Sequence, residues 1–322
     1  MTFLWNLEST MIIGSKLPPD HVDRTYFSSG RAAFSFLIGQ VVKPRKVYLP
    51  AFTCWSLVSA LERRFPKIVL EFYPVERDLK CHYPQYVAQD EALVFIHFFG
   101  FENRTPLPKI DGTLLEDWSH SYLSQISPAA RYVFGSYRKI VKVADGGFIN
   151  QYFNPMYEPC KKLDTWLRLQ SKDWRDVREA ENMIDRSWCI ADISSQSLAI
   201  LLHSNGDLIR QRRRANEAFL LKELKVGVPQ LRYRVQECPL LHNRLFSSTE
   251  ERNSLRAFLA TKGIFTSIHW PTHDAVKRAE CDISDVLWLE AHILSIPISH
   301  DYGLNDMEHV ASCVDEWSRI AS

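Results

Sequence analysis

Three short clusters of polar residues, each directly after an apolar run, carry the side chains that could perform chemistry. The first is Ser29-Gly30-Arg31, which opens an apolar helical stretch. A Ser-Gly turn at a helix start exposes backbone N–H groups beside the positive end of the helix dipole, an arrangement that suits a phosphate. Ser29 is also a good N-cap residue, and that alternative role involves no ligand.

The second cluster is Glu116-Asp117-Trp118-Ser119-His120, at the end of another apolar run. Two acids in this position cost free energy unless something pairs with them. A carboxylate here can hold the proton of a pyridinium nitrogen, which makes a cofactor ring an electron sink. The alternative is an N-cap role for Asp117 in the segment that follows.

The third cluster is Ser136-Tyr137-Arg138-Lys139, which precedes the glycine turn Asp145-Gly146-Gly147. A lysine beside a hydroxyl and a second cation fits an activated amine, because neighbouring cations and burial both lower the lysine pKa. The alternative is an ordinary solvated lysine on the surface.

A largely parallel sheet is expected to position these clusters, because short apolar runs alternate with longer helical segments. Strands are predicted at 46–49, 69–73, 92–97, 113–116 and 132–136, with a helix at 53–64. Ligands of such sheets bind beyond the carboxyl ends of the strands. All three clusters are predicted to lie there.

The pattern changes after about residue 155, and a smaller C-terminal α+β domain is predicted. Residues 158–185 are charged and helical in composition, and 193–224 reads as helix with a break at Asn205-Gly206. Strands are expected at 231–235, 266–270 and 294–298, with helices after Ser248-Thr249 and over 306–320. We expect a large α/β domain over 1–210 and a small domain over 211–322.

Composition argues for a cytoplasmic protein without nucleic-acid or membrane partners. The formal charge is +1, and the basic run at 210–214 is predicted to be a solvated helix face. The longest apolar stretch, 92–101, has about half the length that spans a bilayer. The N-terminus shows no targeting pattern, and seven cysteines without a CxxC pair predict reduced thiols. No metal site is expected, since Pro271 between His269 and His273 argues against a helical ligand pair.

Taken in order, the clusters resemble the DegT/StrS-type sugar aminotransferases, which are fold-type-I pyridoxal-phosphate enzymes. The resemblance covers most of the chain and rests on residues 29–33, 49–53, His97 with Gly100, 116–120, the Lys139 segment, 262–271 and 294–298. It implies an aspartate-aminotransferase-like large domain with a mainly parallel sheet, plus the smaller C-terminal α+β domain.

The same resemblance implies roles for individual residues. Lys139, eight residues before Gly147, is expected to form the Schiff base with pyridoxal 5′-phosphate, in preference to Lys142. Asp117 is expected on the ring nitrogen and His120 beside the ring hydroxyl. The remaining predicted cofactor residues are the phosphate-binding Gly30, Arg31 and Ser136, and Cys54 or Trp55 at the ring-stacking position.

The implied function is a transaminase that moves an amino group, with glutamate as donor, onto a nucleotide-linked keto sugar. A homodimer is implied as well, because active sites of the family lie at the subunit interface. The alternative is a non-catalytic relative that keeps the fold and binds a ligand. Ser187-Trp188-Cys189 motivates this alternative, because the family has Asn-Tyr-Arg there and its asparagine reaches the partner's cofactor phosphate.

Overall fold

A computed structural model describes residues 24–158 and 188–321. Nearly all of the charged segment 158–185, and Ser187 as well, therefore lie outside the described residues. The largest β-sheet of the structure has seven strands. Six of them run parallel to one another, and the seventh is antiparallel to both of its neighbours. In spatial order they are β1 (Thr25–Phe27), the antiparallel β9 (Gly147–Ile149), β8 (Tyr132–Ser136), β7 (Thr113–Asp117), β5 (Glu91–Ile96), β2 (Lys46–Pro50) and β3 (Val69–Tyr73).

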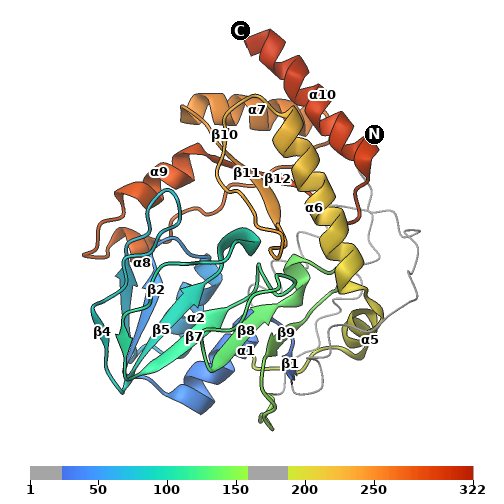
Figure 1. Ribbon diagram of the computed structural model, residues 1–322. Helices are drawn as coiled ribbons and strands as arrows, with labels where there is room; N and C mark the ends of the chain where they lie inside the picture. Colours follow the sequence, from blue (N-terminus) through green and yellow to red (C-terminus); the bar gives the residue numbers. More distant parts are fainter. Residues whose placement is uncertain (1–23, 159–187, 322) are drawn as a thin grey trace.

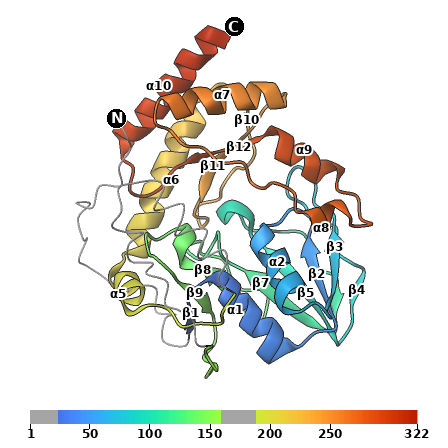
Figure 2. The same ribbon diagram turned by 180° about the vertical axis from the view of Figure 1, so that it is seen from behind.

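The five strands predicted for the large domain are all present, and the mainly parallel α/β architecture is confirmed. Helices α1 (Gly30–Phe36) and α2 (Trp55–Arg64) lie on the same face of this sheet (Figures 1 and 2). Helix α1 continues into a π-helical stretch, Leu37–Val42, which ends where Lys43 adopts a left-handed conformation with φ of 51°. The carboxyl ends of β1 and β2 lead directly into these two helices.

A second sheet of three antiparallel strands follows, with β11 (Leu241–Leu245) between β10 (Val228–Pro229) and β12 (Ile293–Pro297). Both views place it, with three long helices, on one side of the large sheet (Figures 1 and 2). The helices in the C-terminal half of the chain are α5 (Ser195–His203), α6 (Gly206–Glu223), α7 (Thr249–Thr261), α8 (Asp274–Lys277), α9 (Ser284–His292) and α10 (Leu304–Ala321).

Two helix starts in this half match the capping residues of the sequence. The side chain of Asn205 accepts from Leu208 N at 3.1 Å, so the helical stretch breaks where Asn205-Gly206 predicted. Ser248 Oγ accepts from Glu251 N at 3.1 Å and starts α7. Each oxygen satisfies one backbone N–H group that a helix start leaves without an intrahelical partner.

Two predicted strands are wrong. Residues 231–235 form a loop, in which Leu231 is buried and Val235 is 81% exposed. Apolar and polar residues alternate in this segment because single side chains attach the loop to the protein. Tyr233 Oη, for example, donates to Phe99 O at 3.1 Å. Residues 266–270 make only an isolated bridge, between Ser267 and Ser295. The strand that pairs with β12 is β11. Its central residues are polar, so a hydropathy pattern does not predict it as a strand.

The basic run on α6 departs from the predicted solvated face at one residue. Arg213 is 3% exposed, and its guanidinium donates to Leu240 O at 2.8 Å and to Ile140 O at 3.4 Å. These bonds tie α6 to the residue before β11 and to the segment that follows the η4 turn (Tyr137–Lys139). The domain boundary near residue 210 stays a prediction, and α6 runs through that position.

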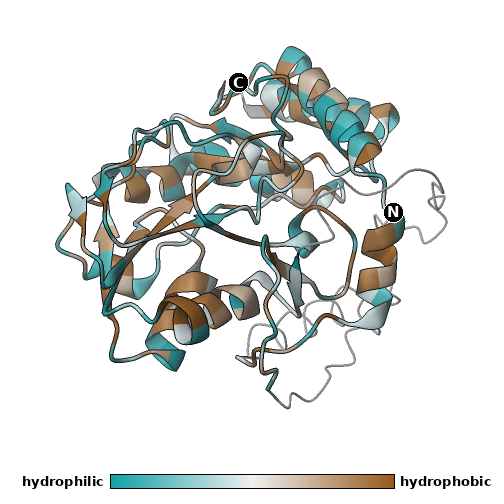
Figure 3. Ribbon diagram, turned by 60° about the horizontal axis from the view of Figure 1, so that its bottom comes forward, coloured by the Kyte–Doolittle hydropathy of each residue, from teal (hydrophilic) through white to brown (hydrophobic). Residues whose placement is uncertain are grey.

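The described residues form three hydrophobic cores. One joins α1 and α2 to the large sheet, one packs α5 and the start of α6 against β8, β9 and the η4 turn, and one packs α6, α7 and α10 on β12. The helices carry hydrophilic and hydrophobic residues together (Figure 3), as expected for helices that cover a sheet with one side only. Within the described ranges, none of the helices combines the length and hydrophobicity needed to cross a membrane.

Two short elements of the large domain complete the description. Strands β4 (Tyr86–Val87) and β6 (Lys109–Ile110) pair in parallel beside the sheet. The η3 turn (Phe98–Gly100) follows β5, and Phe99 within it has a positive φ of 56°. A bulky residue with positive φ is strained, and such strain persists only where surrounding contacts hold it.

Candidate active site

A cavity of about 320 Å³ lies at the carboxyl ends of the parallel strands. Its walls include residues that directly follow β1, β2, β7 and β8, because parallel strands bring their carboxyl ends to one edge of the sheet. Of the two lysines near the glycine turn, Lys139 lines the cavity and Lys142 does not. All eight residues predicted for a cofactor line it: Gly30, Arg31, Cys54, Trp55, Asp117, His120, Ser136 and Lys139.

Asp117 is the last residue of β7 and is 7% exposed. Burial raises the pKa of its carboxyl group, while the hydrogen bond from Ser119 and the charge of Lys139 oppose that rise. Ser119 N donates to Asp117 Oδ1 at 2.7 Å, which fixes the carboxylate at the end of the strand. A buried carboxylate gains most from a cationic N–H partner, and a protonated pyridine nitrogen is such a partner.

His120 is held in one tautomer by the strained turn after β5. Phe99 N donates to His120 Nδ1 at 3.1 Å, so the proton of the neutral imidazole is on Nε2. Burial lowers the pKa of His120 well below its ordinary value, and the charges of Lys139 and His269 lower it further. The ring therefore stays neutral near pH 7 and keeps one N–H donor, on Nε2.

Two aromatic rings lie against this histidine, and the three rings stack on one another. Phe99, His120 and Trp270 lie with ring centroids 5.5–5.6 Å apart and planes within 15–19° of one another. Trp270 lines the cavity and is 8% exposed. The sequence motif at 262–271 contains Trp270, but a strand was the only role predicted for it. Trp270 is far in the sequence from the three polar clusters, so the sequence pattern did not predict that it lines the cavity.

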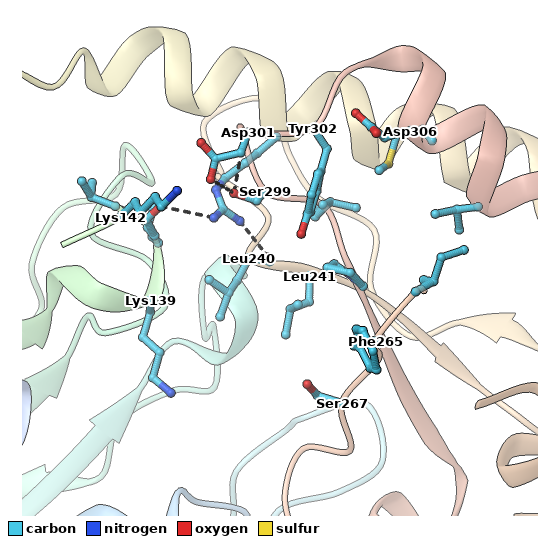
Figure 4. A pocket seen from close by; sticks show the side chains of 18 of the residues that line it. Lys139, Lys142, Leu240, Leu241, Phe265, Ser267, Ser299, Asp301, Tyr302 and Asp306 are labelled. Atoms are coloured by element: carbon cyan, nitrogen blue, oxygen red, sulfur yellow. Dashed lines mark hydrogen bonds between the residues drawn. The ribbon is translucent and has the colours of Figure 1, made fainter. Parts of the chain in front are cut away.

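Lys139 stands between this cavity and a second one of about 450 Å³. Figure 4 shows the Lys139 side chain pointing to the end of the second cavity where Ser267 lies. Lys142 lies near Asp301, at the opposite end of that cavity. The second cavity lies between the segment after β8 and the residues of the small sheet, α6 and α10. Its lining is largely apolar and includes Leu240, Leu241, Ile264, Phe265, Ile298, Met307 and Val310.

His269 lines the second cavity and was not assigned a role from the sequence beyond the rejected metal pair. Its Nδ1 atom lies 2.9 Å from Ser295 Oγ. Burial, together with the charge of Lys139, lowers the pKa of His269 to about 3. This pKa keeps His269 neutral, so it places no second positive charge beside the lysine amine.

The turn after β1 approaches the neighbouring strand ends very closely. A Cβ atom on Gly30 would lie 3.1 Å from Gly135 O and from Ser136 Cβ. Ser29 Oγ accepts from Ala32 N at 3.1 Å, so the predicted N-cap role is confirmed. Thr53 Oγ1 is buried at the cavity wall without a hydrogen-bond partner in the described chain. A buried hydroxyl of this kind is available to a ligand oxygen.

Two of the predicted cofactor residues already have partners within the chain. Ser136 Oγ donates to Gly146 O at 3.4 Å, a long bond that a better acceptor would replace. Cys54 precedes α2, and its Sγ accepts from Ser56 Oγ at 3.2 Å. The stacking position thus holds a sulfur group at the cavity wall, and the indole of Trp55 lies one residue further on.

The residues of the cavity fit pyridoxal phosphate on three observations. A buried carboxylate lies at one strand end, a lysine amine reaches the cavity, and a close glycine turn with an unpartnered threonine hydroxyl lies nearby. These are the groups that a pyridine nitrogen, an aldehyde and a phosphate ester would use.

No family model and no curated protein sequence matches this chain. Solved structures of aminotransferases do match it in fold. The aminotransferase TlmJ from Streptoalloteichus hindustanus is similar, with a TM-score of 0.66 and 14% identity over 93% of this chain and 87% of that one. PseC from Helicobacter pylori, an aminotransferase involved in the biosynthesis of pseudoaminic acid, gives 0.64 and 12% over 91% and 86%.

A third similar structure is a DegT DnrJ EryC1 StrS aminotransferase from Brucella abortus, with a TM-score of 0.58. Its identity is 14% over 91% of this chain and 85% of that one. At such low identity these likenesses establish the fold. The chain therefore has the fold of the sugar aminotransferases to which its sequence motifs point.

Proposed function

We propose that this chain is a pyridoxal-phosphate-dependent aminotransferase that transfers an amino group from glutamate to a nucleotide-linked keto sugar. The observation that carries this proposal is the convergence of eight predicted residues, from four separate segments, on one cavity. A likeness of fold alone would leave the chemistry open. The presence of both Lys139 and Asp117 in that cavity supports transamination in particular.

Pyridoxal phosphate, when bound, supplies a ring that stabilises negative charge at the substrate Cα. Asp117 would hold a protonated ring nitrogen, because a buried carboxylate is stabilised by a positive charge beside it. His120 would offer its Nε2–H to the ring hydroxyl oxygen, since Phe99 N already occupies Nδ1. Lys139, whose amine lines the cavity, would be the residue that holds the cofactor aldehyde, and its free amine would be the base for a proton at the substrate Cα.

The second cavity is proposed to admit the acceptor. It reaches Lys139 from the side of the small sheet and is larger than the first cavity. Its lining combines apolar side chains with polar groups such as Ser267, Ser299 and Asp301, which could bind sugar hydroxyls. The sugar aminotransferases among the similar structures support a keto sugar as acceptor.

The proposal is tested by the visible absorption spectrum of the purified protein, recorded before and after addition of glutamate. The cofactor bound through Lys139 is expected to give a visible band that glutamate bleaches, with one 2-oxoglutarate formed per site. Lys139→Ala should abolish the band, whereas Lys142→Ala, the neighbouring control, should keep it. A wild-type protein that shows no band after incubation with pyridoxal phosphate would contradict the proposal and favour the non-catalytic alternative.

A homodimer is also proposed, by resemblance to the family. The mass of one chain is 37.4 kDa, so sedimentation equilibrium should give about twice that value. A monomer at micromolar concentration would count against a site shared between subunits.

A further inference from the structure

Arg31, on the cavity wall, belongs to an alternating stack of indole and guanidinium groups. Its Cζ lies 5.3 Å from the ring centroid of Trp55 and 4.7 Å from that of Trp188. Arg63 lies over the Trp188 ring as well, at 4.7 Å. We call these four residues the Trp–Arg stack. It runs from exposed Arg63 inward to Arg31, which is 9% exposed.

The backbone of Trp188 is fastened to helix α2. Arg64 donates to Trp188 O and, at 3.1 Å, to Glu158 Oε2, which also accepts from Ile190 N at 3.0 Å. The chain is thus held at Trp188 O and again at Ile190 N, and Trp55 lies within the first turn of α2. The two indoles consequently confine the Arg31 side chain before any ligand arrives.

A cation over an aromatic face is attracted by the ring, and a guanidinium presents its N–H groups within its own plane. In-plane N–H pairs match the oxygens of a phosphate, which carries a charge of about −1.5 to −2 near pH 7. The unpartnered hydroxyl of Thr53 lies two residues before Trp55 and lines the same cavity. This hydroxyl is a second, independent sign of a ligand oxygen in the cavity.

The distribution of charge gives the cavity a direction. Asp117 places a negative charge at the end of β7, where a phosphate would be repelled. Arg31 places a positive charge beside the turn after β1, where Gly30 leaves no room for a side chain. These two charges favour a ligand bound with its basic ring nitrogen at Asp117 and its phosphate ester at Arg31.

We propose that the Arg31 guanidinium, confined by Trp55 and Trp188, is the phosphate-binding cation of this cavity, with Trp188 as its positioning residue. The inference rests on the proposed function, since the phosphate belongs to the cofactor. It goes further by assigning phosphate recognition to a side chain rather than to backbone N–H groups. It also gives Trp188, from the divergent 187–189 segment, a part in the site.

The test compares pyridoxamine 5′-phosphate with pyridoxamine, two ligands that differ only in the phosphate and form no bond with Lys139. Equilibrium dialysis gives both dissociation constants. Wild type should prefer the phosphorylated ligand. Arg31→Ala and Arg31→Gln should each reduce that preference roughly 10- to 100-fold, because a charged hydrogen bond is lost, and should change the affinity for pyridoxamine little.

Trp188→Leu should reduce the preference roughly 3- to 10-fold, and Trp188→Phe should restore most of it, because a cation–π contact positions the cation. A purely structural role of Trp188 would weaken both ligands alike. Arg77→Ala is the matched control, since Arg77 lies 4.3 Å over the ring of Trp288, a residue outside the cavity lining. That variant should keep the wild-type preference.

Two results would overturn the inference while leaving the proposed function intact. One is that the Arg31 variants lose affinity equally for pyridoxamine 5′-phosphate and pyridoxamine, or lose no affinity for either. The other is loss of the preference in Arg138→Ala, a second cation of the cavity wall, with the preference retained in Arg31→Gln. If wild type bound neither ligand, both the proposed function and this inference would fall.

Discussion

Replacing Gly147 with alanine should break the contact between strand β9 and the turn that lines the cavity. Gly147 opens β9, and a Cβ atom there would lie 2.1 Å from Ser29 O and 2.5 Å from Gly30 N. Both neighbours are backbone atoms, which no side-chain rotation can move. The clash therefore falls on the turn between β1 and α1, where the phosphate is proposed to bind.

The size of the effect follows from these distances. Ordinary contact begins at 3.4 Å, so the 2.1 Å approach leaves about 1.3 Å to be made up by displacement of the backbone. Overpacking of this severity costs about 3 kcal/mol. For a chain of 322 residues that cost corresponds to a fall in Tm of roughly 4 °C. The displaced turn should also weaken binding of pyridoxamine phosphate.

The matched control is Gly303→Ala, because the nearest atoms to a Cβ at that position are side-chain atoms at 3.6 and 3.8 Å. Its unfolding free energy should stay within about 0.5 kcal/mol of wild type. Urea unfolding followed by circular dichroism measures both variants. If Gly147→Ala were as stable as Gly303→Ala, the close approach of β9 to the Ser29–Gly30 turn would be refuted.

Three further predictions concern buried ionisable groups. Because the pKa of His269 is lowered to about 3 in the folded state, unfolding takes up a proton below pH 6.5, and stability should fall by about 2 kcal/mol from pH 7 to pH 5. Urea unfolding at both values should show a shallower fall in His269→Leu, and an unchanged fall would contradict this pKa. Burial raises the pKa of Glu116, but the hydrogen bond from His97 at 2.6 Å and other donors lower it overall. Its stabilisation is therefore present above the unfolded pKa and lost as pH falls through the folded one, so Glu116→Gln should cost about 2–3 kcal/mol at pH 7 and less at pH 4. Thermal melts at the two pH values check this difference, and an equal cost at both would refute it. Asp117→Asn should keep the fold and slow the glutamate half-reaction roughly 100-fold or more in stopped-flow absorbance, and an unchanged rate would remove Asp117 from the ring nitrogen.

Much of the large domain could be predicted from the sequence because its strands are buried, apolar and followed by polar residues. The strand at 69–73 and the strand at 132–136 have the predicted bounds. The carboxyl-end rule for parallel strands then placed Asp117 and Lys139 in one cavity without any knowledge of their contacts. Capping residues such as Asn205 and Ser248 were equally readable, because their side chains act within one turn.

What could not be predicted depends on contacts between distant segments. Strand β11 has His242, Asn243 and Arg244 at its centre, all buried, and only the partners of these side chains make that burial possible. His242 Nδ1 lies 2.8 Å from Glu217 Oε2, and Arg244 Nη2 donates to Gly227 O at 2.8 Å. A hydropathy pattern reads such a strand as a loop.

The same limit applies to the candidate site. Trp270 and Thr53 line the cavity, and Trp188 approaches it through Arg31. None of the three carries a spacing that indicates a ligand. Trp188 lies 157 positions from Arg31 in the sequence, as the two residue numbers give, and only the fold of the chain brings their side chains together.

The central claim is that Lys139 is the cofactor lysine, and covalent trapping tests it most directly. The protein is incubated with pyridoxal phosphate, reduced with borohydride and digested, and the modified peptide is identified by mass spectrometry. We predict one phosphopyridoxyl group per chain, on Lys139, at stoichiometric cofactor. Modification spread over surface lysines, or confined to Lys142, would contradict the claim.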